Sequence, residues 1–231
     1  MILEGIREAV RLLTSFDPEA WGPVGVSVTV ALTSTLIASF LALPFGLLVG
    51  LGRFRGKRAV VIVLNTLLAL PTVLVGLVIY AMLTRRGPLG SWDMLYTPAA
   101  MVIGQVILAF PIIAAFCAAA VERADPRVRQ TVLGLGAGRL RAALVVAAEN
   151  RAALVAAVAA GFGRVFAEVG ISMMVGGNIH GYTRNITTGI AFETGKGEFA
   201  LGVALGIVLL VVALAVNLAV GFWQSRAGRR S

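Results

Sequence analysis

The sequence predicts an all-α membrane protein with an N-terminal interfacial helix and five transmembrane helices. Of its 231 residues, 58% are hydrophobic and only 13% are charged, about half the roughly 25% that is typical of soluble domains. Apolar runs long enough to cross a bilayer recur along the chain, and basic residues gather in the loops between them. The net charge of +9 therefore indicates loops at a membrane surface, not nucleic-acid binding.

The N-terminal segment, residues 1–20, predicts an amphipathic helix that lies in the membrane interface. Ile2, Ile6 and Val10 fall on one helical face, and the charged residues fall elsewhere. The pair "DP" at positions 17–18 then predicts the start of a new helix, because it offers an acceptor at the N-cap and proline at the first helical position.

Five apolar segments predict a transmembrane domain over residues 22–225. A spanning helix needs roughly 20 apolar residues, because about 30 Å of hydrocarbon is crossed at about 1.5 Å per residue. Four of the segments contain no charged residue, and each of the first three contains one proline that predicts a bend: Pro44, Pro71 and Pro111. The predicted spans are residues 24–51, 59–84, 98–121, 143–174 and 199–223.

The fourth span is unusual because it carries Arg164 and Glu168. These residues are four apart, so on one continuous helix they share a face and can pair. A lone arginine at mid-bilayer would cost about 2.5–3.5 kcal/mol, so the pair must face protein or water. Two interpretations stay open: a structural ion pair that locks helices together, and a pair that lines a polar pathway.

A polar interruption follows the third span and covers residues 122–141. Asp125 and Pro126 predict a helix start, and a glycine-rich turn around Gly136 predicts the end of that helix. Apolar spacing from Leu140 onward predicts a second helix. The interruption is therefore either a compact helix-turn-helix at the membrane surface or an ordinary basic loop.

The basic residues predict how the chain is oriented. Counted by alternate loops, thirteen lysines and arginines lie on one side and six on the other. The positive-inside rule places the thirteen in the cytoplasm. We therefore expect the N-terminus outside, the C-terminus and residues 122–141 inside, and the segment 175–198 outside.

The outer segment is rich in glycine, asparagine and threonine around Arg184. Amides, hydroxyls and exposed backbone N–H groups beside an arginine suit a passing anion, and a plain polar turn would have a similar composition. The sequence has no phosphate-binding "GxxxxGK[ST]" loop, no Cys/His metal set and no nucleophile–base arrangement. We expect no enzyme activity, no metal and no cofactor in this chain, so a pump would need a separate chain to bind ATP and Mg²⁺.

The order of these parts resembles the type I ABC importer permeases, which have the MetI-like fold. That family carries an "EAA" signature, a glycine three residues on and a later "LP". The aligned stretch here is "QTVLGLGA": Gln130, Thr131 and Val132 stand at "EAA", Gly136 matches the glycine, and the "LP" position holds "AE". By this resemblance, residues 122–141 are the coupling region. Its candidate ATPase-coupling residues are Asp125, Pro126, Val128, Arg129, Gln130, Val132, Leu135, Gly136 and Arg139.

Two further stretches are similar to the tungstate-type group of these permeases. They read "LPTVLVGLVIYAMLTRRGPLG" and "AEVGISMMVGGNIHGYTRNITTGIAFETGKGEFALGVALGI", and the resemblance extends over nearly the whole chain from about residue 22. Molybdate and sulfate permeases are similar but differ in the second stretch. The resemblance implies a homodimer in a prokaryotic inner membrane with two cytoplasmic ATPase subunits and an extracytoplasmic oxyanion-binding protein.

We therefore expect a permease subunit of an ATP-driven importer for an oxyanion, tungstate first and molybdate or another oxyanion as the alternative. A secondary transporter or channel that uses the charged pair of the fourth span is the competing hypothesis, although no internal repeat supports it. Candidate residues for the translocation path or gate are Arg164, Glu168, Met173, Met174, Gly176, Gly177, Asn178, Thr183 and Arg184.

Overall fold

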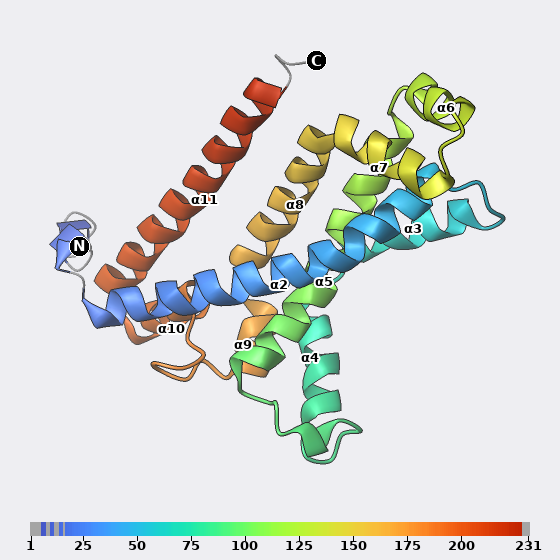
Figure 1. Cartoon of the computed structure of the whole chain (residues 1–231). Coiled ribbons are helices and arrows are strands. Elements are labelled where there is room, and N and C mark those ends of the chain that lie inside the picture. Colours follow the sequence, from blue (N-terminus) through green and yellow to red (C-terminus); the bar gives the residue numbers. More distant parts are fainter. Residues whose placement is uncertain (1–5, 8–9, 12–13, 16, 228–231) are drawn as a thin grey trace.

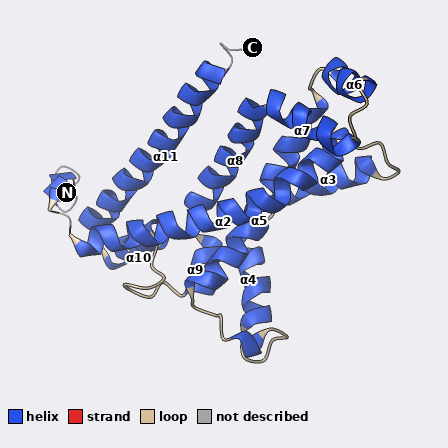
Figure 2. Ribbon diagram, in the orientation of Figure 1, coloured by secondary structure: helices blue, strands red, loops and turns tan. Residues whose placement is uncertain are grey.

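The computed structural model describes residues 6–7, 10–11, 14–15 and 17–227, with side chains up to residue 223. Every regular element in this part of the chain is a helix (Figures 1 and 2). The interfacial helix expected over residues 1–20 falls largely outside the described residues. The helices are α2 (Pro18–Leu51), α3 (Lys57–Leu68), α4 (Thr72–Leu83), the short 3₁₀ helix η1 (Gly90–Trp92), α5 (Pro98–Glu122), α6 (Pro126–Gly134), α7 (Arg139–Glu149), α8 (Arg151–Phe166), α9 (Gly170–Gly176), α10 (Ile186–Lys196) and α11 (Phe199–Ala227).

Helices α2 and α5 pack along one another and form the centre of the bundle (Figure 1). The start of α2 is the one that the sequence predicts, because the Asp17 carboxylate accepts a hydrogen bond from the backbone N–H of Glu19 at 2.8 Å. Glycine permits the close approach of the two helices. A Cβ atom at Gly46 would lie 2.7 Å from the Cβ of Cys117, and one at Gly50 would lie 2.8 Å from the carbonyl oxygen of Ala118.

The second predicted span is two helices in the structure. The span predicted over residues 59–84, with a bend at Pro71, is divided into α3 and α4, which meet at 96°. Pro71 causes the break, because it has no backbone N–H and its ring clashes with the preceding turn, and it becomes the N-cap of α4. In contrast, α2 continues through Pro44 and α5 through Pro111.

The prediction of one helix over residues 143–174 is wrong, because three helices, α7, α8 and α9, cover this range. Helices α7 and α8 meet at 76° around Asn150, and α8 ends three residues before α9 begins. Contacts from elsewhere support the second break. The Glu168 carboxylate accepts from the backbone N–H of Ile171 at 3.2 Å, and Thr187 donates to the carbonyl oxygen of Glu168 at 2.7 Å. Backbone N–H and C=O groups that lose their helical partners at the break therefore form hydrogen bonds inside the protein, as an apolar environment requires.

The described helices include three that are long and apolar enough to cross a membrane, namely α2, α5 and α11, and five spans if each bent pair counts as one. Figure 1 shows the α2–α3 turn, helices α6 and α7, and the end of α11 toward one end of the bundle. The turn after α4 and the loop before α10 lie toward the other end. Two potential sites therefore occupy opposite ends of the molecule: the coupling region and the 175–198 segment.

Candidate functional site

Residues 122–141, which the resemblance identifies as a coupling region, form the first of the two predicted alternatives, a helix-turn-helix. Asp125 caps α6 by accepting from the backbone N–H of Arg127 at 2.8 Å, with Pro126 at the first helical position. The turn to α7 passes through Gly136, whose φ of +84° favours glycine. The backbone N–H of Ala137 closes the turn on the carbonyl oxygen of Val132 at 3.2 Å.

This helix-turn-helix presents an exposed apolar tip with basic residues around it. No residue of α6 is buried, and Leu135 is 82% exposed at the turn, with Leu140 and Leu144 also exposed at the start of α7. Such a patch, rimmed by polar residues, is typical of a surface that contacts a protein or a membrane. Of the candidate coupling residues, Val128, Arg129 and Val132 are half-buried, and the exposed ones are Asp125, Pro126, Gln130, Leu135, Gly136 and Arg139.

The base of the coupling region is fixed to the rest of the bundle. Lys57, at the start of α3, forms an ion pair with Glu122 at the end of α5, with 3.0 Å between Nζ and Oε1. The same ammonium donates to the carbonyl oxygen of Gly50 near the end of α2 at 2.9 Å. Val128 packs against the apolar cluster that includes Val146. Val128 therefore connects α6 to the cluster at the ends of α5 and α7, and Lys57 connects the adjoining ends of α2, α3 and α5.

Arg164 and Glu168 form the ion pair that their spacing predicts, although a continuous helix does not carry it. The Nη1 atom of Arg164 lies 2.6 Å from Oε2 of Glu168. Glu168 is 2% exposed and holds both Arg164 and the first turn of α9, whereas the Arg164 side chain is 39% exposed. Glu168 is therefore the buried member of the pair, and Arg164 is its partly exposed member.

The loop between α9 and α10 is held by its own polar side chains. Thr183 is buried, and its hydroxyl donates to the carbonyl oxygen of Gly176 and accepts from the backbone N–H of Ile179. Thr183 therefore fixes the shape of this loop in the structure. Gly177 has a φ of +69°, and a Cβ there would lie 2.7 Å from the ring of Tyr96. Asn178 also has a positive φ, and its Oδ1 is buried without a partner.

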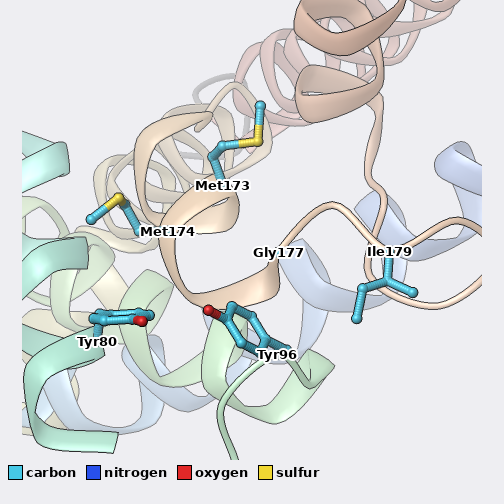
Figure 3. Close-up of a pocket in the computed structure, with 6 residues that line it drawn as sticks. All are labelled: Tyr80, Tyr96, Met173, Met174, Gly177 and Ile179. Carbon is cyan, nitrogen blue, oxygen red and sulfur yellow. The ribbon is translucent and has the colours of Figure 1, made fainter. Parts of the chain in front are cut away.

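Met173 and Met174 line a cavity of about 530 Å³ (Figure 3). Two tyrosines that the sequence analysis did not select, Tyr80 of α4 and Tyr96 before α5, complete one wall, with ring centroids 6.3 Å apart. The hydrogen bond with the Tyr80 side chain, together with burial, raises the pKa of Tyr96 above its usual value, so its phenol is neutral at pH 7. The cavity thus combines thioethers and phenol hydroxyls.

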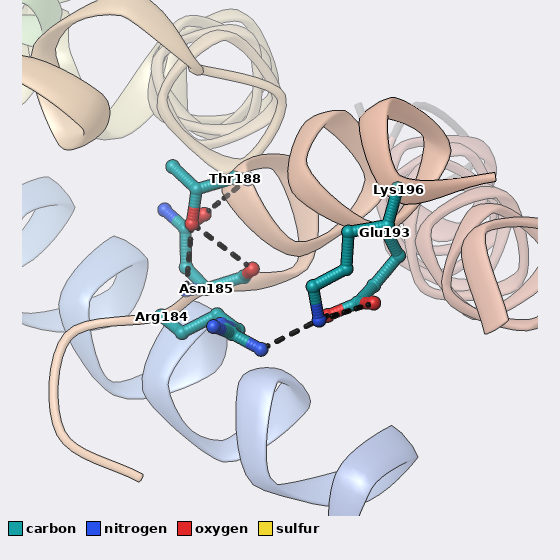
Figure 4. A network of polar contacts seen from close by, with 5 residues as sticks. All are labelled: Arg184, Asn185, Thr188, Glu193 and Lys196. Carbon is teal, nitrogen blue, oxygen red and sulfur yellow. Dashed lines mark hydrogen bonds and ion pairs between the residues drawn. The ribbon is translucent and has the colours of Figure 1, made fainter. Parts of the chain in front are cut away.

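Arg184 belongs to a different cavity, of about 540 Å³, between α2, α10 and α11. Its Nη1 lies 3.0 Å from Oε1 of Glu193, and Lys196 lies 3.1 Å from Oε2 of the same carboxylate (Figure 4). Both cations also lie over the ring of Phe192. Arg184 is thus only 14% exposed, and its charge is shared with a buried glutamate.

The start of α10 joins three parts of the bundle. Asn185 and Thr188 form a capping box (Figure 4), and Ser27 of α2 accepts from the backbone N–H of Ile186 at 2.7 Å. Thr187 reaches the break between α8 and α9 through Glu168. The candidate path residues thus divide among a charged pair, two cavities and a self-supporting loop. Ser27, Tyr80, Tyr96 and Glu193 were missed by the sequence analysis. The partner of Ser27 lies 159 residues away in the sequence, whereas Glu193 lies only nine residues from Arg184, within reach of a local pattern.

The comparisons with known proteins agree with this architecture. No family model matches the chain. The "Tungstate uptake system permease protein TupB" of Peptoclostridium acidaminophilum is 41% identical over 203 residues, or 88% of this chain and 89% of that protein. The protein of the same name from Campylobacter jejuni is 38% identical, over 88% and 85% of the two chains. The "Molybdenum transport system permease protein ModB" of Escherichia coli is 29% identical over 74% of this chain and 77% of its own.

A solved structure shares the fold. A chain from the inward-facing MetNI methionine ABC transporter superposes with a TM-score of 0.73, covering 91% of this chain and 98% of its own, at 16% identity. The bundle, its broken spans and its exposed helix-turn-helix therefore define a multi-pass membrane permease subunit of the ABC transporter class, which is not itself an enzyme. Within that class, the chain belongs to the family of tungstate uptake permease proteins.

Proposed function

We propose that this chain is the permease subunit of an ATP-driven importer that carries tungstate into the cell. The observation that supports this proposal is the identity of 38–41%, over 88% of the chain, to tungstate uptake permeases of two different bacteria. The molybdenum and sulfate permeases are more distant, at 29% identity over a smaller share of the chain. Molybdate or another oxyanion is therefore the alternative cargo.

The proposed assembly has two copies of this chain, two cytoplasmic ATPase subunits and an extracytoplasmic oxyanion-binding protein. The sequence contains no phosphate-binding loop, so the ATPase subunits bind ATP and Mg²⁺. The exposed apolar tip around Leu135 supports docking of the coupling region into a groove of each ATPase. The distribution of basic residues supports a cytoplasmic position for that region, with the C-terminus inside and the N-terminus outside.

In the proposed cycle, ATP-driven closure of the ATPase pair moves the two coupling regions. The bend around Asn150 passes the movement from α7 to α8, and the contact of Glu168 with Thr187 carries it on to α10. The bundle then changes from an inward-open to an outward-open form, and the binding protein delivers the anion. Glu168 would repel a dianion, so its role is to hold Arg164 in place while the partly exposed guanidinium faces the cargo.

The coupling region can be tested by reversing one charge. We expect Arg129→Glu to reduce co-purification of the ATPase and to reduce tungstate accumulation, measured by elemental mass spectrometry of cells, in parallel. Arg85→Glu is the control, because Arg85 is exposed in the turn after α4, and Figure 1 shows this turn toward the opposite end of the bundle. Arg129→Glu cells that take up tungstate normally would contradict the assignment of the coupling region.

Uptake measurements in deletion strains test the cargo and the energy source. Deleting the gene for this chain should abolish high-affinity tungstate accumulation, and excess molybdate should compete only weakly. Equal competition by molybdate would make the cargo a wider class of oxyanion. Uptake that persists without the ATPase subunit would favour a secondary transporter.

A further inference from the structure

The turn between α2 and α3 carries four basic residues within six positions, 53–58. One of them, Lys57, points into the protein and is used twice, by the carbonyl oxygen of Gly50 and by the carboxylate of Glu122. These two contacts fix the turn against the ends of α2 and α5. The turn therefore has a fixed conformation, and its three arginines project from a defined position.

The three arginines of this turn, Arg53, Arg55 and Arg58, are exposed. Within the described part of the chain none of them forms an ion pair. Phe54 lies between the first two and is 46% exposed, so an apolar ring is presented beside the guanidinium groups. Unpaired guanidinium groups beside an exposed aromatic ring are typical of the boundary between lipid headgroups and acyl chains.

Helix α3 continues this pattern along its outward face. Arg58 lies four residues before Ile62, so the two side chains share a helical face. Ile62 and Val63 are 56% and 55% exposed, whereas Leu64 on the inner face is buried against the core. The outward face of α3 is therefore cationic at its first turn and apolar one turn later.

We propose that the α2–α3 turn binds the headgroup of an anionic phospholipid. The arginines would contact the phosphodiester, since guanidinium groups match phosphate oxygens in geometry and charge. Phe54 and Ile62 would contact the first part of the acyl chains. A soluble partner would need the cations but not an apolar face that continues along α3 at membrane depth, so the surface fits a lipid better than the ATPase. This inference is independent of which anion is transported.

The test uses the full-length chain in phosphatidylcholine nanodiscs with a rising fraction of phosphatidylglycerol. Native mass spectrometry counts the phosphatidylglycerol molecules that stay bound, which gives an apparent affinity. Each arginine near a membrane surface contributes about fivefold to the attraction of anionic lipid. We expect Arg55→Gln/Arg58→Gln to weaken binding by about that factor for each residue, and Phe54→Ala to weaken it further. The matched control is Arg85→Gln/Arg86→Gln, which removes two exposed arginines from the opposite end of the bundle.

Three results would overturn the proposal. Binding that is unchanged in Arg55→Gln/Arg58→Gln would show that the turn holds no lipid. An equal loss in the control pair would show general charge attraction without a site. Unchanged lipid binding together with loss of the ATPase from the purified complex would make this turn an ATPase contact. Because the substituted side chains are exposed, all variants should keep the wild-type circular dichroism spectrum, which checks that they fold.

Discussion

Glu168 is the residue on which several parts of the structure converge. Its carboxylate is 2% exposed and contacts both Arg164 and the first turn of α9. Glu168→Gln keeps the side-chain volume and removes the charge, which leaves Arg164 without its partner. Breaking a buried pair costs roughly 3–5 kcal/mol. We expect a smaller loss of stability, about 2 kcal/mol, since Arg164 is 39% exposed and water can solvate it.

Denaturant unfolding of the purified permease measures this loss, and a double-mutant cycle with Arg164→Gln separates the pair from its surroundings. We expect the double variant to be less damaged than the sum of the two single variants, because removing both charges leaves none uncompensated. The matched control is Glu198→Gln, where the glutamate is exposed. Strictly additive losses would show that the pair contributes nothing to the fold.

Among the elements, α10 depends most clearly on partners from other helices. Ser27 of α2 accepts from the backbone N–H of Ile186 at 2.7 Å, in a buried position. Ser27→Ala leaves that N–H unsatisfied, at a cost of about 1–3 kcal/mol. We expect faster hydrogen–deuterium exchange at the start of α10 as a result. The matched control is Ser39→Ala on the same helix, because the Ser39 hydroxyl has no partner. Equal exchange in the two variants would contradict this role for Ser27.

The same contacts explain which elements the sequence could predict. Asp125 and Pro126 act on groups two residues away, so a local pattern predicts α6 correctly. The break between α8 and α9 depends instead on Thr187, nineteen residues from the carbonyl that it caps, and no local pattern contains that information. Pro71 is an intermediate case. A proline in a membrane helix predicts a bend, but the angle of the bend depends on packing. Helix α5 continues through Pro111, whereas α3 and α4 meet at 96°.

At the scale of the whole molecule, the number of spans and the orientation depend on how the broken helices are placed in the bilayer. The apolar segments and the family could be predicted from the sequence because composition and motif spacing do not depend on how the chain folds. The sites were less accessible. Arg184 was expected to meet a passing anion, but it is paired with Glu193 on α10, and Tyr80 meets Tyr96 only through the packing of α4 against the loop before α5.

The orientation of the chain gives the last prediction. Cys117 is the single cysteine in the sequence, and it is buried. Cys117→Ser therefore gives a background without a thiol and preserves a donor toward the carbonyl oxygen of Leu43.

A cysteine is then added at one exposed position, either Gly134 of α6 or Arg86 after α4. A membrane-impermeant maleimide should label Arg86→Cys in intact cells that lack an outer-membrane barrier. Gly134→Cys should be labelled only after the cells are permeabilised, since the positive-inside rule places α6 in the cytoplasm. The reverse pattern would put α6 outside the cell, where no ATP-hydrolysing subunit could reach it.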